Sequence, residues 1–155
     1  MIVTWTTLRA REPARTVPWE PRGARAWQAG SSGAGRLDAP LPDGRWWSVL
    51  ATWDDRSEAE VGPAPHDGLD VWHVVLETAS SSGDAVLAGG ARPFDDVPRT
   101  GSVDGAVAVV TFAGAALDGG KEREFFRRSM ALGRDVATAP GMVTALLQAQ
   151  TTARC

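Results

Sequence analysis

Residues 45–55 constrain the fold of this chain more than any other stretch. Trp46, Trp47 and Trp53 lie around the apolar run 49–51, between a Pro-Asp-Gly turn signal and an acidic pair. A short apolar run bounded in this way is typical of a buried strand. Alternation places Trp47 and Trp53 on one side and Trp46 on the other, and neither side is purely polar. We therefore predict a central strand that is covered on both of its faces.

Composition limits the class of protein. With 155 residues, 43% hydrophobic and 23% charged, the chain suits one ordinary domain or two small repeated units that share a core. The net charge of -3 gives no reason to expect a nucleic-acid partner. Cys155 is the single cysteine, and no apolar run approaches the roughly 20 residues of a membrane span. We expect a cytoplasmic protein without a transmembrane segment.

The first half of the chain predicts two further strands and two helical segments. Residues 2–9 alternate like a strand, and residues 69–78 do the same. Prolines early and a glycine at the end predict a short helix from Trp19 or Pro21 to Ala29. Residues 55–61 are expected to form about two helical turns, because glycine and proline follow them.

Residues 30–35 form a glycine-rich stretch that we interpret as a turn. Such a stretch is either a flexible connector or a phosphate-binding loop, and the second needs a helix after it. Pro40 and Pro42 argue against that helix.

The second half begins after a segment rich in Gly, Pro and Asp. A brief strand at 85–88 precedes this segment, which we place at 89–105 as a linker. Strands are then expected at 106–112 and 142–150. Between them, an apolar stripe of helical period predicts a helix over 121–138.

Strand, helix and strand thus occur twice, starting at residues 2 and 106. The pattern favours an α+β chain of ferredoxin-like repeats that form a dimeric-type α/β barrel. We expect a first unit at 1–88, the linker, and a partial second unit at 106–155 packed on the first. The second repeat looks incomplete, so either the chain is truncated or a partner subunit, such as a second copy in a homodimer, completes the barrel.

Several segments resemble successive blocks of the spheroidene monooxygenase-like proteins, which are carotenoid ketolases. The resemblance covers residues 26–33, 47–54, 71–76 and 92–94, and it continues over 107–148. The order of strand, helix, Pro-Gly break and strand is also similar to that of the antibiotic biosynthesis monooxygenases, which share the dimeric α/β-barrel fold. The family typically continues beyond the position of Cys155.

The resemblance implies oxygen insertion into an apolar polyene or related substrate in carotenoid biosynthesis, with haem as the suspected cofactor. Haem needs an axial ligand such as His, Cys or Tyr. Tyrosine is absent and the cysteine ends the chain, so His66 and His73 remain. His66 lies in a loop that is expected to be exposed. His73 lies inside the strand 69–78. It is a satisfied interior histidine, an axial metal ligand or a catalytic acid or base.

Candidate substrate-binding residues come from both halves of the chain. Trp27, Trp47 and Trp53 are expected either to form the wall of an apolar pocket or to be plain core. Thr144 and Gln148 belong to a polar row on the last strand, which either lines a cavity or faces solvent.

Three functions stay open. The leading prediction is a monooxygenase, an oxidoreductase similar to spheroidene monooxygenase. The alternatives are a non-catalytic subunit that binds a hydrophobic ligand or serves assembly, and a cofactor-free monooxygenase acting on a polycyclic aromatic substrate. Zinc clusters, dinucleotide and Walker loops and nucleophile elbows are absent from the sequence.

Overall fold

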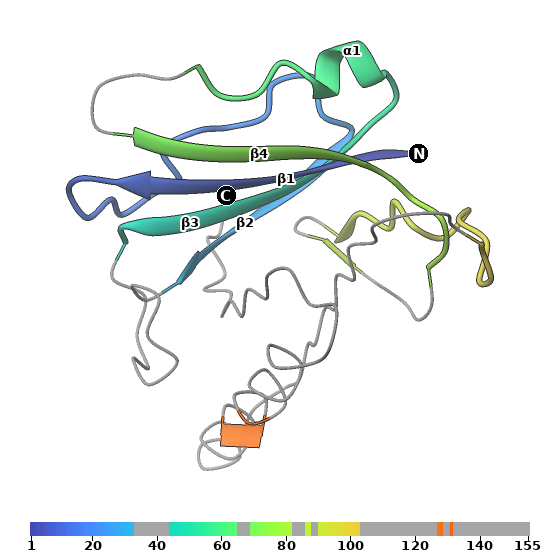
Figure 1. The fold of residues 1–155 in the computed structure, drawn as a ribbon. Helices are drawn as coiled ribbons and strands as arrows, with labels where there is room; N and C mark the ends of the chain where they lie inside the picture. The colour runs from blue at the N-terminus through green and yellow to red at the C-terminus, as the bar shows by residue number, and fades with distance from the viewer. Residues whose placement is uncertain are drawn as a thin grey trace.

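The described part of the chain is a four-stranded antiparallel sheet with one short helix, an α+β arrangement (Figure 1). The structure is a computed structural model, and it describes residues 1–32, 44–64, 69–81, 86–87 and 90–102, together with 127, 128 and 131. Within these ranges the elements are β1 (Ile2–Ala10), β2 (Ala26–Ser32), β3 (Trp46–Trp53), α1 (Arg56–Ala59) and β4 (Leu69–Glu77). The strand order is β2-β3-β1-β4, and every neighbouring pair is antiparallel.

The strand predicted from residues 45–55 is confirmed as an interior strand of this sheet. β3 pairs with β1 on one side and with β2 on the other. All of its residues from Trp47 to Trp53 are buried, which shows that both faces are covered. The β-branched and aromatic residues of β3 suit a pleated surface that packs on two sides. The predicted strands at 2–9 and 69–78 are also confirmed, as β1 and β4.

The helix predicted from Trp19 or Pro21 to Ala29 is wrong. Residues 13–25 contain no helix, and residues 26–32 are β2, so Gly30 lies inside a strand rather than a turn. Pro18 and Pro21 lack backbone N–H groups, and Gly23 has a φ of 88°, a left-handed value that ends a right-handed helix. Residues 26–32 instead pair with 46–52 of β3, and this ladder satisfies the backbone groups on one edge of β2.

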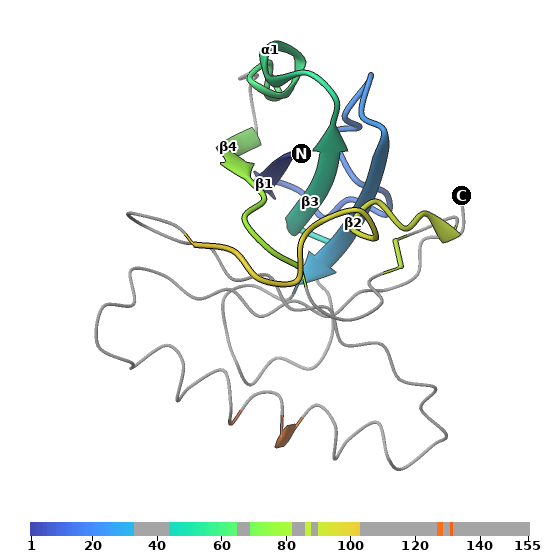
Figure 2. The ribbon, with the colours of Figure 1, turned by 90° about the vertical axis from the view of Figure 1, so that its right-hand side faces the viewer.

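The two sheet faces are covered by different segments. α1 and the segment 11–25 cover the face that we call the α1 face, where Leu8, Trp47 and Val49 form one buried cluster and Ala51, Trp53 and Ala59 form another (Figures 1 and 2). On the opposite face, Leu87, Ala91 and Phe94 pack on Val3 and Leu50. The segment 90–102, yellow in Figure 2, lies on that side of the sheet. Part of the predicted linker is therefore packed against the sheet.

Most of the second half lies outside the described residues. This holds for the strands predicted at 106–112 and 142–150, and therefore for the second ferredoxin-like unit. Within the helix predicted over 121–138, residues 127, 128 and 131 are helical. At the brief strand predicted over 85–88, residues 86 and 87 are described and are not in a strand. No helix among the described residues is both long enough and apolar enough to cross a membrane.

Candidate functional site

An open depression lies on the α1 face, between the segment before β2 and the segment after α1. Its volume is about 680 Å³, and it is lined by residues 17–20, 22–23, 53, 58 and 61–62. This volume falls within the range of about 300–1,000 Å³ that is usual for small-molecule sites. Two tryptophan rings, from Trp19 and Trp53, belong to the lining. The depression therefore combines an aromatic surface with access from solvent.

Trp53 anchors the depression to the sheet. It is the last residue of β3 and is 3% exposed. Its indole Nε1 donates a hydrogen bond of 2.9 Å to Thr4 Oγ1 on the neighbouring strand β1. A buried indole N–H needs such a partner, and the bond fixes the orientation of the ring. Trp53 therefore forms a rigid, nearly buried part of the lining.

The turn at Gly23 brings the chain close to Trp53 and α1. A Cβ placed on Gly23 would stand 3.4 Å from Glu58 Oε2 and 3.8 Å from Trp53 Cζ3. Gly23 thus lies close to both the Glu58 carboxylate and the Trp53 ring, and a side chain at this position would contact both. The positive φ of 88° favours glycine at this position for a second, independent reason.

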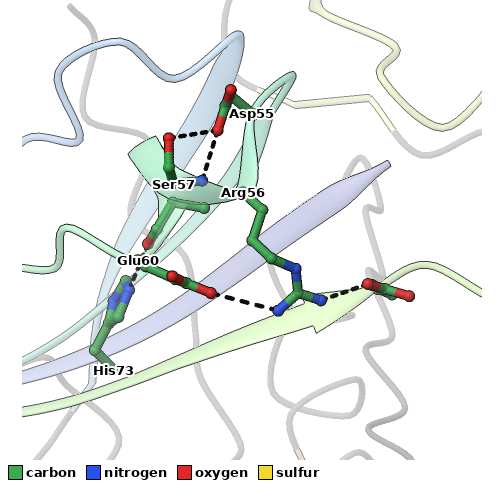
Figure 3. Close-up of polar contacts among 7 residues, drawn as sticks. Asp55, Arg56, Ser57, Glu60 and His73 are labelled. Carbon is green, nitrogen blue, oxygen red and sulfur yellow. Dashed lines mark hydrogen bonds and ion pairs between the residues drawn. The ribbon is translucent and has the colours of Figure 1, made fainter.

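Charged contacts hold α1 in place beside the depression (Figure 3). The Asp55 carboxylate accepts bonds of 2.6 Å from the backbone N–H and the hydroxyl of Ser57, which makes it the N-cap. These bonds lower the pKa of Asp55 below its ordinary value of 3.8. Arg56 pairs with Glu77 on β4 and lies 3.6 Å from Glu60, and Glu77 raises the pKa of the guanidinium further.

His73 connects three elements behind the depression. Its Nδ1 lies 2.7 Å from Thr6 Oγ1 on β1, and its Nε2 lies 2.8 Å from the Ala59 carbonyl oxygen at the end of α1 (Figure 3 shows the second contact). The ring packs edge-on against Trp19, with centroids 6.4 Å apart. A Cβ on Gly62 would stand 2.9 Å from its Cγ. We call the Thr6, His73 and Ala59 arrangement the histidine clamp.

The partners of His73 determine where its protons are. A carbonyl oxygen only accepts, so Nε2 carries a hydrogen and donates to Ala59. In the neutral ring, Nδ1 then accepts from the Thr6 hydroxyl. Because Thr6 is completely buried, this hydroxyl has no access to solvent. The clamp ties α1 to β1 and β4.

The predicted site residues that the structure describes all lie on the α1 face. Trp53 lines the depression, and His73 lies directly behind its lining residues Trp19 and Gly62. Trp47 is buried in the cluster with Leu8, and its indole donates to the Gly44 carbonyl at 2.9 Å. Trp27 packs against both clusters of this face and is not among the lining residues. His66, Thr144 and Gln148 lie outside the described residues.

Sequence reasoning missed Trp19, Glu58, Val61 and Gly62, which also line the depression. The signal for Trp19 was its place between Pro18 and Pro21, since a tryptophan in a segment that cannot form regular structure has to be packed by tertiary contacts. Val61 is 73% exposed, which is unusual for a valine. No sequence signal connected residues 58–62 with 17–23.

His73 is not placed to ligate a haem iron. Both ring nitrogens are hydrogen-bonded within the protein, so ligation would require one of these bonds to break. The ring also lies under Gly62 and against Trp19. The described residues thus do not fit the group at this position. Across the same residues, no group of three or more His, Cys, Asp or Glu side chains is placed to hold a metal ion.

Comparison of the chain with protein-family models, with curated proteins and with solved structures finds no match in any of the three.

Proposed function

We propose that this chain binds a flat, apolar small molecule in the depression between residues 17–23 and 58–62. The observation that carries the proposal is the pair of tryptophans in the lining of an open depression of about 680 Å³: Trp19 is partly exposed, and the nearly buried Trp53 forms part of its floor. Aromatic rings supply a large apolar contact area at little cost in conformational entropy. A polyene or a polycyclic aromatic molecule matches such a surface.

The rigidity of the surroundings supports binding. Trp53 is fixed by its bond to Thr4, and Trp19 is held edge-on by a histidine that is itself bonded at both nitrogens. A preorganised site loses less entropy when a ligand binds, so more of the contact energy appears as affinity. The same contacts hold each tryptophan side chain in one rotamer.

The second candidate function is oxygen insertion into the bound molecule, as in the monooxygenases that the sequence resembles. The strand order supports the fold that this candidate requires, although the fold does not by itself determine the reaction. Because β1 and β2 are each antiparallel to β3, they run parallel to one another, which is the arrangement of a split β-α-β unit. The segment 11–25 takes the place of the first helix, and α1 takes the place of the second. Ferredoxin-like units paired into a barrel are the architecture we propose for the whole assembly.

Within this second candidate, the histidine clamp favours chemistry without haem at His73. A ring that is bonded at both nitrogens serves as a structural tie, and no reaction step is assigned to it. A cofactor-free reaction on a polycyclic aromatic substrate asks the protein mainly to bind, orient and exclude water.

Binding is tested with N-phenylnaphthylamine, a neutral probe whose fluorescence rises in apolar surroundings. We expect saturable binding at one site per chain, weakened about tenfold or more in Trp19→Ala, which removes one ring. Trp72→Ala is the matched control, because Trp72 is 49% exposed on the opposite sheet face. This control should bind the probe like the original chain.

A blocking variant protects the test against misfolding of Trp19→Ala. Val61 is 73% exposed, so Val61→Arg places a charged side chain at the depression without disturbing the core. Probe binding that survives both Trp19→Ala and Val61→Arg would overturn the proposal, and so would the absence of binding to the original chain.

A further inference from the structure

Two threonines of β1 are buried behind the depression and do not line it. Thr4 and Thr6 are both completely buried, and because they are two residues apart on one strand, both side chains lie on the α1 face. Valine has the same branched shape and can be buried without the cost of desolvating a hydroxyl group. Packing alone therefore does not explain a hydroxyl group at either position, whereas the hydrogen bonds that the two groups form do.

Each of the two hydroxyl groups supports one tryptophan of the lining. Thr4 Oγ1 does so directly, since it accepts the bond of 2.9 Å from Trp53 Nε1. Thr6 Oγ1 acts through His73, because it lies 2.7 Å from Nδ1 of the imidazole ring that packs edge-on against Trp19. Two aromatic rings in this geometry gain more than their buried area alone provides. Thr6 thus influences the position of the Trp19 ring by way of His73.

Trp19 depends on side-chain contacts more than the opposite wall of the depression does. In the part of the chain that the structure describes, residues 17–20 form no backbone hydrogen bond, whereas the backbone N–H groups of 61 and 62 are bonded within the turn after α1. A segment with few backbone hydrogen bonds is ordered by the packing of its side chains. The Trp19 side chain packs on the cluster around Leu8 and on His73, and the contact with His73 is the one that depends on Thr6.

We infer that Thr4 and Thr6 are positioning residues, which raise the affinity of the depression for its ligand through Trp53 and Trp19. The inference rests on the proposed function, because it assigns what determines affinity at that same site. A side chain that must be ordered when the ligand binds costs free energy, so a ring that is already fixed gives tighter binding. Loss of the Thr6 hydroxyl leaves His73 Nδ1 without its donor, and loss of the Thr4 hydroxyl leaves the Trp53 N–H without its acceptor.

A fluorescence titration with N-phenylnaphthylamine tests the role of Thr6. We expect Thr6→Val to weaken binding about three- to tenfold, the range that one edge-on ring contact supports. Thr6→Ser keeps a hydroxyl group and should restore most of the affinity. Thr52→Val is the matched control, because Thr52 is also completely buried and donates to the Ala26 carbonyl oxygen at 3.3 Å, but lies on the opposite face of the sheet. This control should bind the probe like the original chain even where it lowers stability in urea.

A double-mutant cycle separates positioning from a general loss of stability. If Thr6 acts through Trp19, Thr6→Val should change affinity little in the Trp19→Ala background. Thr4→Val acts through Trp53, so it should weaken binding in both backgrounds, and it decides the question independently where Thr6→Val does not fold.

Three results would overturn the inference and leave the apolar site standing. They are unchanged affinity in Thr6→Val or Thr4→Val, an equal loss of affinity in Thr52→Val, and a loss in Thr6→Val that is as large without the Trp19 ring as with it. If the original chain does not bind the probe, the proposed function itself fails.

Discussion

At the residue scale, the histidine clamp connects the sheet, α1 and the depression. His73 satisfies the buried Thr6 hydroxyl and the carbonyl at the end of α1, and it supports Trp19 in the depression. Its removal leaves two polar groups without their partners, and each such group costs about 1–3 kcal/mol when it is buried. The clamp thus links the fold to the candidate site.

We expect His73→Ala to lower the free energy of unfolding by about 2–4 kcal/mol, because both bonds are lost. Urea denaturation followed by tryptophan fluorescence measures this loss. Asp70→Asn is the control on the same strand, with an 81% exposed side chain, and should change stability by less than about 0.5 kcal/mol. A loss in His73→Ala no larger than that of the control would show that the clamp does not form.

Gly62 gives a second test of the same contact. An added Cβ would stand 2.9 Å from the His73 ring, so we expect Gly62→Ala to destabilise the protein by about 1–3 kcal/mol through overpacking. In the His73→Ala background the ring is gone, and most of this cost should disappear. A double-mutant cycle in urea measures the coupling. Additive losses would contradict the predicted contact.

The sequence supplied only part of this arrangement. Strand alternation separated His73 from Trp72, but it did not determine which face of the sheet carries α1, and His73 lies on the α1 face. Alternation could not identify the hydrogen-bond partners of His73, because Thr6 and Ala59 are 67 and 14 residues away along the chain. Pairing of β4 with β1 and the position of a four-residue helix determine these contacts, and local patterns carry no information about either.

At the scale of elements, β2 shows how tertiary pairing overrides a local signal. Residues 19–29 have prolines and a glycine in the places typical of a helix, yet 26–32 pair with β3 along their whole length. Because β3 is buried on both faces, its backbone N–H and C=O groups need a partner strand on each edge. The sequence identified β3 as an interior strand, but it did not identify which segment would lie beside it.

α1 is a single turn, and its N-cap is therefore expected to carry much of its order. Asp55→Ala removes the acceptor for the Ser57 N–H and should lower the urea midpoint, whereas Asp55→Asn keeps an acceptor and should change it less. Denaturation of the two variants side by side measures the difference. Equal effects would mean that the negative charge, and not the hydrogen bond, matters.

Asp55 also makes the stability of the protein depend on pH. Its pKa is lower in the folded protein than its ordinary value of 3.8, so its contribution to the free energy of unfolding is fully present above that pH. It is lost as the pH falls from there toward the lowered pKa, where the folded carboxylate takes up its proton. Asp55→Asn should flatten this part of the stability profile. A profile identical to that of the original chain would refute the assignment.

At the scale of the whole molecule, the sheet has a cover on each face. α1 and the segment 11–25 cover one face and build the depression, while the segment that contains Leu87 and Phe94 covers part of the other. We interpreted residues 89–105 as a linker because of their Gly, Pro and Asp content. Turn-forming residues do not prevent a segment from packing, and Ala91 and Phe94 of this segment pack against the cluster that contains Leu87.

Two adjacent residues test this cover. Leu87 is 3% exposed against Val3 and Leu50, so Leu87→Ala should cost about 2–4 kcal/mol of stability. Val86 is 46% exposed, and Val86→Ala should cost less than about 0.5 kcal/mol. Chemical denaturation of both variants is sufficient. Similar losses at the two positions would mean that this segment is not docked on the sheet.

The binding of an apolar ligand beside Trp19 and Trp53 is the central claim, and an NMR titration of the indole N–H signals tests it most directly. The chain has seven tryptophans, so each indole reports on its own surroundings. With N-phenylnaphthylamine, we expect the Trp19 and Trp53 signals to shift in a saturable way while those of Trp46 and Trp72 stay in place. Shifts confined to Trp46 and Trp72, or no shift at all, would contradict the account.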